Sequence, residues 1–250
     1  MVSLQQITEY LRGYLALESV SDYPQAFNGL QLENRGEVTR IVAAVDACEA
    51  VMVAAAEHSS SLLLVHHGLF WNAATLTGAM YRKVHAAVAG DLAVYSAHLP
   101  LDVHPEVGNN ILLAKAVGLH DLEPFLPIKG QPAGVSGHSA LSRDQLHARL
   151  EVELGASVHV CAAGPERPHR VGVVTGGAGS EVARAAAAGV DTFITGEGPH
   201  WSYTLAEELG VNLFYGGHYA TETFGVKALA EHLSGKFGLP WEFIDHPTGL

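Results

Sequence analysis

Two apolar segments separated by a short helical segment constrain the fold more than any other feature of this chain. RIVAAVDA (40–47) and SLLLVHHG (61–68) have the length and composition of buried strands, and the Ala-rich residues 48–60 between them have helical character. A strand, a helix and a second strand within about thirty residues form a βαβ unit, whose two strands are parallel. The sequence therefore predicts an α/β fold.

The rest of the chain continues this alternation. The patterns predict helices at 3–17, 80–91, 109–119, 180–190, 201–209 and 220–234, and strands at 92–102, 170–177, 191–198 and 211–218, with an edge strand in 239–247. The segment 124–137 carries three prolines and three glycines, which is typical of a boundary between domains. We therefore expect two α/β lobes joined near this segment.

Composition excludes several classes of protein. The 250 residues carry a formal net charge of −12, which argues against a nonspecific nucleic-acid surface. No apolar run reaches the length of about eighteen residues that a membrane-spanning helix needs. The N-terminal segment lacks the basic and apolar regions of a signal peptide, and only two cysteines occur, so we expect a cytoplasmic protein.

Fifteen histidines are spread along the chain, and several follow predicted strands together with carboxylates. Ligands of parallel α/β sheets gather at the carboxyl ends of the strands. We therefore expect the side chains at four predicted strand exits to meet at one sheet edge. These side chains are His66 and His67, His98 and Asp102, Glu197 and His200, and His218 and Glu222.

Each of these signals also has an ordinary interpretation. Fifteen histidines in 250 residues produce about one adjacent pair by chance, so His66 and His67 also fit a polar strand exit. His218 and Glu222 share one helix face if a helix begins near His218, but they also fit a solvated pair. Ordinary roles exist for the others too: a hydrogen-bonded core histidine (His98), a loop carboxylate or helix cap (Asp102), and loop polarity (Glu197, His200).

Taken together, these side chains form a set of nitrogen and oxygen ligands without thiolate. Such a set suits Zn, Fe, Mn, Co or Ni. Two ions about 3.5–4 Å apart that share one carboxylate are well suited to hydrolysis. Glu197 and His200 are then candidates for residues that orient the ligands.

Five motifs at these positions resemble a known family. In chain order they are FNGLQLE (27–33), VHHGLFW (65–71), YSAHLPLD (95–102), TGEGPHW (195–201) and GGHYATE (216–222). The set resembles the YbgI-like dinuclear metal-centre family, the GTP cyclohydrolase 1 type 2 homologs, over nearly the whole chain.

The resemblance implies a fold and an assembly. The fold is α/β, with two interlocked lobes and mixed, largely parallel sheets. An inserted lobe at 127–209 interrupts a metal-ligand-bearing lobe at 1–126 and 210–250. The assembly is a toroidal homohexamer whose metal sites face an inner cavity.

The resemblance also implies two divalent metal ions per chain. His67, Asp102 and Glu222 would hold one ion, and His66, His218 and the shared Glu222 would hold the other. His98 aligns with a family histidine that supports the site or contacts substrate. With Glu197, His98 is our candidate for catalytic proton transfer.

The family name implies opening of the GTP imidazole ring by water, but the chain has no Walker A motif. Its nearest glycine-rich segment is TGGAGS (175–180). The backbone amides of this segment suit a phosphate at a helix N-terminus. Alternatively, its glycines let the helix pack close to the sheet. Our main hypothesis is a metal-dependent hydrolase of a nucleotide or another phosphate-bearing small molecule. The alternatives are a non-enzymatic protein for metal storage, delivery or regulation, and a metal-free scaffold.

Overall fold

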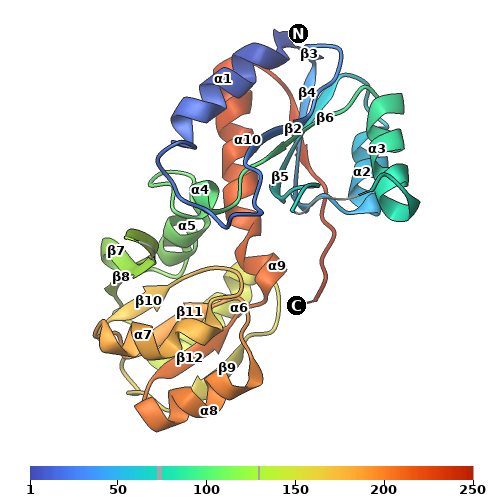
Figure 1. The fold of residues 1–250 in the computed structure, drawn as a ribbon. Coiled ribbons are helices and arrows are strands. Elements are labelled where there is room, and N and C mark those ends of the chain that lie inside the picture. The colour runs from blue at the N-terminus through green and yellow to red at the C-terminus, as the bar shows by residue number, and fades with distance from the viewer. Residues whose placement is uncertain (72–74, 129, 250) are drawn as a thin grey trace. The chain divides into compact units, whose positions relative to one another are not determined.

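The chain folds into two compact α/β units (Figure 1). The computed structural model describes residues 1–71, 75–128 and 130–249. Unit 1 comprises residues 1–101 and 225–246, and unit 2 comprises residues 102–224 with the short tail from 247. The chain therefore leaves unit 1 after residue 101, builds most of unit 2, and returns to unit 1 at residue 225.

These unit boundaries differ from the lobe boundaries expected at 126/127 and 209/210. Strand β7 (His120–Ile128) pairs with β8 (Gln131–His138), and β12 (Asn212–Tyr215) pairs with β11 (Thr192–Thr195). Residues on both sides of each expected boundary thus belong to the sheet of unit 2. As a consequence, Asp102, His218 and Glu222 belong to unit 2, whereas His66, His67 and His98 belong to unit 1.

Unit 1 is built on a five-stranded sheet with the order β13–β4–β5–β6–β2. The first four strands are parallel neighbours, and β2 runs antiparallel to β6. The strands are β2 (Gly29–Leu32), β4 (Arg40–Asp46), β5 (Ser61–His67), β6 (Ala93–Ser96) and β13 (Trp241–Phe243). The predicted βαβ unit and the edge strand near the C-terminus are both present, and β1 (Val2–Ser3) and β3 (Glu37–Val38) form a separate pair.

Helices cover both faces of this sheet (Figure 1). The helices α2 (Glu49–Ala55) and α3 (Gly78–Ala89) lie on one face, and α1 (Leu4–Tyr14) and α10 (Thr223–Phe237) lie on the other. On the α2 and α3 face, Val42, Leu63 and Val94 from three neighbouring strands pack with Met52 and Ala87. Because both faces are covered, the parallel strands are apolar along nearly their whole length.

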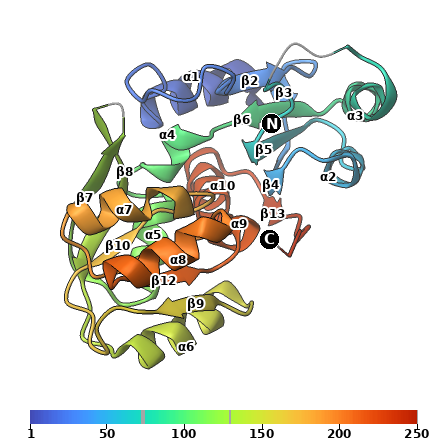
Figure 2. The ribbon, with the colours of Figure 1, turned by 60° about the horizontal axis from the view of Figure 1, so that its bottom comes forward.

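Unit 2 contains a six-stranded mixed sheet with the order β7–β8–β10–β11–β12–β9. Its centre, β10 (Val171–Val173), β11 and β12, is parallel, and β7, β8 and β9 (His159–Ala162) pair antiparallel. Helices α5 (Asn109–Ala116) and α6 (Arg143–Leu154) pack on one face through Leu113, Leu146 and Leu150. Helices α7 (Val182–Ala187) and α8 (His200–Leu209) pack on the other through Val182 and Ala206 (Figure 2).

The expectation of a domain boundary in 124–137 is wrong. Most of this segment forms the antiparallel hairpin β7–β8 at one edge of the unit 2 sheet. Pro124 and Pro127 lie in the edge strand β7, where a missing amide donor is tolerated. Pro132 lies beyond the residues of β8 that pair with β10. The prolines therefore mark a sheet edge and not a linker.

Among the described parts of the chain, none of the helices combines the length and the apolar character that crossing a membrane would require.

The core of unit 2 yields a test with an internal control. Leu150 is fully buried in α6, whereas Val152, two residues later, is 75% exposed. We expect Leu150→Ala to lower the free energy of unfolding by about 2–5 kcal/mol through lost burial and a cavity. Val152→Ala should change it by no more than about 0.5 kcal/mol. Urea denaturation measures both, and equal effects would contradict the packing described.

Candidate metal centre

Three histidines meet at the carboxyl edge of the unit 1 sheet. His66 and His67 end β5, and His98 follows the neighbouring parallel strand β6. One ring nitrogen from each lies within 4.8 Å of those of the other two. The His66 and His67 rings are nearly perpendicular, at 81°, with centroids 4.8 Å apart. The adjacent pair therefore fans out at the end of the strand and both rings can contribute to one cluster.

A carboxylate on the next strand orients His67. Asp46 ends β4 and is the register partner of His67 across the parallel β4–β5 ladder. The His67 Nδ1–H donates to Asp46 Oδ1 at 2.9 Å, because an ionised carboxylate only accepts. Such a hydrogen bond fixes the tautomer and makes Nε2 the nitrogen that can bind a metal.

A second carboxylate orients His98 in the same way. The His98 Nδ1–H donates to Asp22 Oδ1 at 2.9 Å, and Asn28 Nδ2 donates to Asp22 Oδ2 at 2.7 Å. Asn28 Oδ1 in turn accepts from the His98 amide at 2.7 Å. Burial opposes ionisation of Asp22, but the hydrogen bond and charge of His98 and the hydrogen bond from Asn28 outweigh it and hold its pKa below the usual range.

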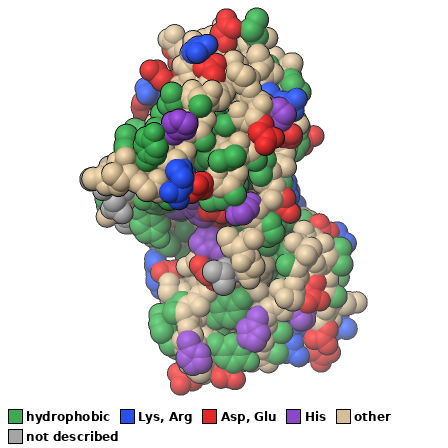
Figure 3. All heavy atoms as spheres, turned by 90° about the vertical axis from the view of Figure 1, so that its right-hand side faces the viewer, with side chains coloured by type: hydrophobic (Ala, Val, Ile, Leu, Met, Phe, Trp, Pro, Cys, Tyr) green, Lys and Arg blue, Asp and Glu red, His purple; other side chains and the backbone are tan. Residues whose placement is uncertain are grey.

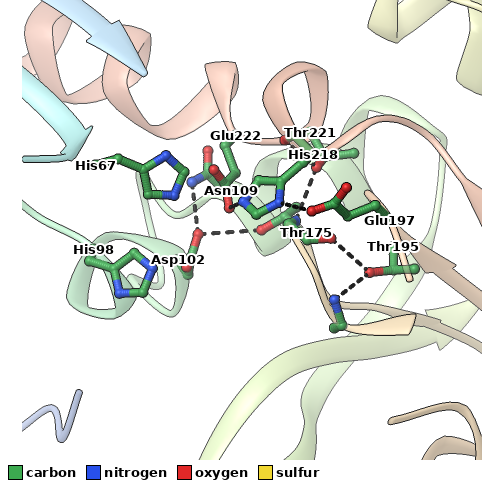
Figure 4. Close-up of polar contacts among 12 residues, drawn as sticks. His67, His98, Asp102, Asn109, Thr175, Thr195, Glu197, His218, Thr221 and Glu222 are labelled. Carbon is green, nitrogen blue, oxygen red and sulfur yellow. Dashed lines mark hydrogen bonds and ion pairs between the residues drawn. The ribbon is translucent and has the colours of Figure 1, made fainter. Parts of the chain in front are cut away.

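In unit 2, His218 and Glu222 form a close pair (Figure 4). Helix α9 (His218–Thr221) begins at His218, so the two side chains share a face, and His218 Nε2 lies 3.1 Å from Glu222 Oε1. His218 Nδ1 donates to Glu197 Oε1 at 2.7 Å. Burial lowers the pKa of His218, but hydrogen bonds and charges from Glu222 and Glu197 outweigh it and raise the pKa to about 9. The same two carboxylates would stabilise a metal cation at Nε2.

Asp102 is the third candidate ligand in unit 2, and it is 6% exposed. It ends the short helix α4 (Leu99–Asp102), and its Oδ1 accepts from Asn109 Nδ2 at 2.8 Å and Thr175 Oγ1 at 3.3 Å (Figure 4). A carboxylate oxygen of Asp102 lies within 4.8 Å of one of Glu222. Two buried carboxylates are thus close together, which is costly unless a cation or proton lies between them.

The glycine-rich segment 175–180 packs tightly and its amides have protein partners. The amides of Gly176, Ala178 and Gly179 donate to Thr221 Oγ1, Thr195 Oγ1 and the Glu197 carbonyl, respectively. A Cβ on Gly176 would lie 2.3 Å from Glu222 Oε1, and one on Gly179 would lie 2.6 Å from Gly198 Cα. Of the two interpretations offered by the sequence, these contacts support close packing.

The expectation of one sheet edge for all eight side chains is wrong, because the ligands come from two sheets. His66, His67 and His98 follow strands of the unit 1 sheet. Glu197, His200 and His218 follow strands β11 and β12 of the unit 2 sheet, and His200 is exposed at the start of α8. Asp22, Asp46, Asn109 and Thr175 were not identified from the sequence. For Asp46, its place at the end of a predicted strand was an available signal.

The residues present fit a metal site. Zn–N and Zn–O bonds of about 2.0–2.2 Å place two ligands of one tetrahedral ion roughly 3.3–3.5 Å apart, close to the 3.1 Å between His218 Nε2 and Glu222 Oε1. His67, His98 and His218 each have Nδ1 held by a carboxylate, as metal-binding histidines usually do. The donors of each unit, taken separately, are therefore arranged as metal ligands.

Comparison with known proteins identifies the family of this chain. The model of the family Duf34/NIF3 (NGG1p interacting factor 3) matches residues 2–248. This chain belongs to that family. A Deinococcus radiodurans family member named GTP cyclohydrolase 1 type 2 homolog is 41% identical over 252 residues, covering 100% of this chain and 95% of the relative.

Two solved structures share the DUF34/NIF3 fold. TTHA1606 from Thermus thermophilus superposes with a TM-score of 0.90 and 38% identity, over 100% of both chains. The protein ybgI, described as of unknown function, superposes with a TM-score of 0.92 and 33% identity, also over 100% of both chains. The resemblance inferred from the five motifs is thereby confirmed, as is the mixed α/β class.

The contact between Gly176 and Glu222 generates a prediction. Gly176 has a φ of +69° and no room for a Cβ beside the Glu222 carboxylate, so Gly176→Ala should displace that carboxylate. We expect a loss of about 1–3 kcal/mol in the free energy of unfolding and weaker metal binding. Gly235→Ala, in α10 with no atom within 4 Å of the new Cβ, should be neutral or stabilising. Thermal unfolding and elemental analysis of both variants provide the measurement.

The hydrogen bond from His67 to Asp46 generates a second prediction. Asp46→Asn keeps the shape of the side chain but removes the charge that fixes the His67 tautomer. We expect metal affinity to fall about 10- to 100-fold, measured by competition with a chelator. Asp144→Asn, which removes one charge from a side chain that is 89% exposed, should leave the affinity unchanged. Equal affinities in all three proteins would show that Asp46 does not support a ligand.

Proposed function

We propose that this DUF34/NIF3 protein binds two divalent metal ions per chain and uses them as a hydrolase. In this proposal the ligands are His66, His67, Asp102, His218 and Glu222, with Glu222 shared by the two ions. The substrate class is a nucleotide or another phosphate-bearing small molecule. The observation that carries the proposal is a set of buried and half-buried imidazoles and carboxylates that are already oriented by the protein. His67 and His218 each have Nδ1 held by a carboxylate, and Asp102 accepts a hydrogen bond from the Asn109 amide.

The path of the chain supports a shared set of ligands. Helix α4 begins in unit 1 with Leu99 and ends with Asp102, the first residue of unit 2. Glu222 immediately precedes α10, which belongs to unit 1 from Gly225 onward. Asp102 and Glu222 are therefore each within three residues of unit 1 along the backbone.

The chemistry of the residues suits hydrolysis. Bound divalent ions would activate water near neutral pH and neutralise negative charge that develops on a substrate oxygen. His98, with Nδ1–H held by Asp22, presents Nε2 as a group that accepts and returns a proton. Glu197 holds His218 in the tautomer that binds through Nε2. Donors of this kind suit Zn, Fe, Mn, Co or Ni.

The first experiment measures metal and turnover together. Untagged protein should contain two equivalents of metal per chain by elemental analysis, and Asp102→Ala should lose at least one. With Mn, Zn, Fe, Co or Ni added, the wild type should hydrolyse GTP or another member of a nucleotide panel, and Asp102→Ala should not. Asp144→Asn is the control for a lost surface charge.

The outcomes separate the candidate functions. Equal turnover by wild type and Asp102→Ala would overturn the hydrolase proposal. Stoichiometric, exchangeable metal without turnover across the panel would indicate metal storage, delivery or regulation in its place. If elemental analysis found no stoichiometric metal, the result would favour a metal-free scaffold.

We also propose that the protein is a cytoplasmic homohexamer. Its two cysteines, Cys48 and Cys161, are both free thiols, which suits a reducing compartment. Light scattering coupled to size-exclusion chromatography should give about six times the chain mass of 26.4 kDa. A monomeric mass would contradict the assembly without bearing on the metal ligands.

A further inference from the structure

An open pocket in unit 2 lies beside the candidate metal ligand His218 and shares Glu197 with it. Its volume is about 460 Å³, within the range of small-molecule sites. It is lined by His159, Glu197, Gly198, Pro199, His200, Tyr203 and Tyr215. On the face of unit 2 in Figure 3, histidine side chains (purple) lie beside apolar and aromatic ones (green).

Aromatic rings form one wall of this pocket. His159 in β9 lies beside Tyr215, its register partner in β12, with ring centroids 6.1 Å apart and an interplanar angle of 24°. The Tyr203 ring of α8 also contacts His159, with centroids 5.5 Å apart and an interplanar angle of 31°. The three rings line the pocket together, and aromatic side chains bind planar rings by stacking.

Hydrogen bonds fix the Tyr215 ring in place. The Ser202 hydroxyl has one hydrogen and donates it to the Pro199 carbonyl at 2.6 Å, so Tyr215 must donate to Ser202 Oγ at 2.7 Å. Burial raises the pKa of Tyr215, which keeps the phenol protonated for this bond. A Cβ on Gly198 would lie 3.1 Å from a Tyr215 ring carbon, so glycine lets the backbone approach the ring. These contacts hold the Tyr215 ring in place within the wall.

Glu197 connects the pocket to the metal ligands. It lines the pocket and also accepts from His218 Nδ1 through Oε1. Its carboxylate provides a hydrogen-bond acceptor and a negative charge beside the aromatic wall. This combination favours a ring with N–H donors on its edge and disfavours a phosphate group. In the neighbouring segment 175–180, the amides of Gly176, Ala178 and Gly179 already donate to protein groups.

We propose that this pocket is the subsite for a planar, N–H-bearing heteroaromatic ring of the substrate, stacked on His159, Tyr203 and Tyr215 and hydrogen-bonded to Glu197. The inference rests on the proposed function, because it names the part of the substrate that lies next to the metal ligand His218. Glu197 then acts as a positioning residue for both His218 and the ring. The class includes purine and pterin-like rings and excludes sugars and simple phosphates.

Binding of guanosine, which has no phosphate, tests the subsite directly. Titration calorimetry on the intact, metal-loaded protein should show guanosine binding and at least tenfold weaker binding of ribose 5-phosphate. Tyr203→Ala and His159→Ala should each weaken guanosine binding about 5- to 150-fold, as loss of a base-stacking ring does. Tyr203→Phe, which keeps the ring, should bind as the wild type does.

Two controls make the result decisive. Tyr81→Ala removes a 55% exposed ring from α3 of unit 1 and should leave guanosine binding unchanged. Metal content and melting temperature should match the wild type in every variant, which separates a lost subsite from misfolding.

The outcomes bear on the two proposals separately. The ring subsite would be overturned if guanosine did not bind, or if it bound wild type, Tyr203→Ala and His159→Ala with equal affinity. Finding two metals per chain in the same protein would still support the metal centre. Ring-dependent guanosine binding without turnover of any nucleotide would support the subsite and count against the hydrolase.

Discussion

The candidate metal ligands of both units depend on one repeated interaction, the hydrogen bond from a histidine Nδ1 to a carboxylate. Asp46 holds His67, Asp22 holds His98, and Glu197 holds His218. Each hydrogen bond selects the tautomer in which Nε2 carries no proton and holds the ring in one orientation. The ring can therefore bind a cation through Nε2 without changing its tautomer or its orientation. The three carboxylates come from three different segments, and each of them requires a particular local fold to reach its histidine.

Parallel strand pairing supplies part of this arrangement. Because β4 and β5 are in register, Asp46 and His67 are neighbours at the strand ends, and because β6 is the next strand, His98 follows at the same edge. In unit 2 the parallel strands β11 and β12 bring Glu197 and His218 to one edge. Both units thus use the usual position of ligands in α/β proteins, beyond the carboxyl ends of parallel strands.

Glycines contribute to the same arrangement by letting the backbone lie close to functional side chains. Gly176 leaves room for the Glu222 carboxylate, and Gly198 leaves room for Tyr215 beside the segment that contains Gly179. A side chain at Gly176 or Gly198 would displace a group that the metal centre or the aromatic pocket requires. Gly176 and Gly198 therefore contribute to this protein by leaving room for neighbouring groups.

The sequence by itself determined the α/β class, the βαβ unit of residues 40–68 and the family, because apolar periodicity and short motifs are local properties. It also indicated His218 and Glu222 as a pair on one helix face, since four residues of helix fix that geometry whatever surrounds it. Only the tertiary structure decided that 124–137 is an edge hairpin, that the ligands follow two sheets, and that Asp22 and Asp46 hold His98 and His67. Those contacts join residues 21 to 76 positions apart, and strand pairing and chain packing, which no local pattern encodes, bring them together.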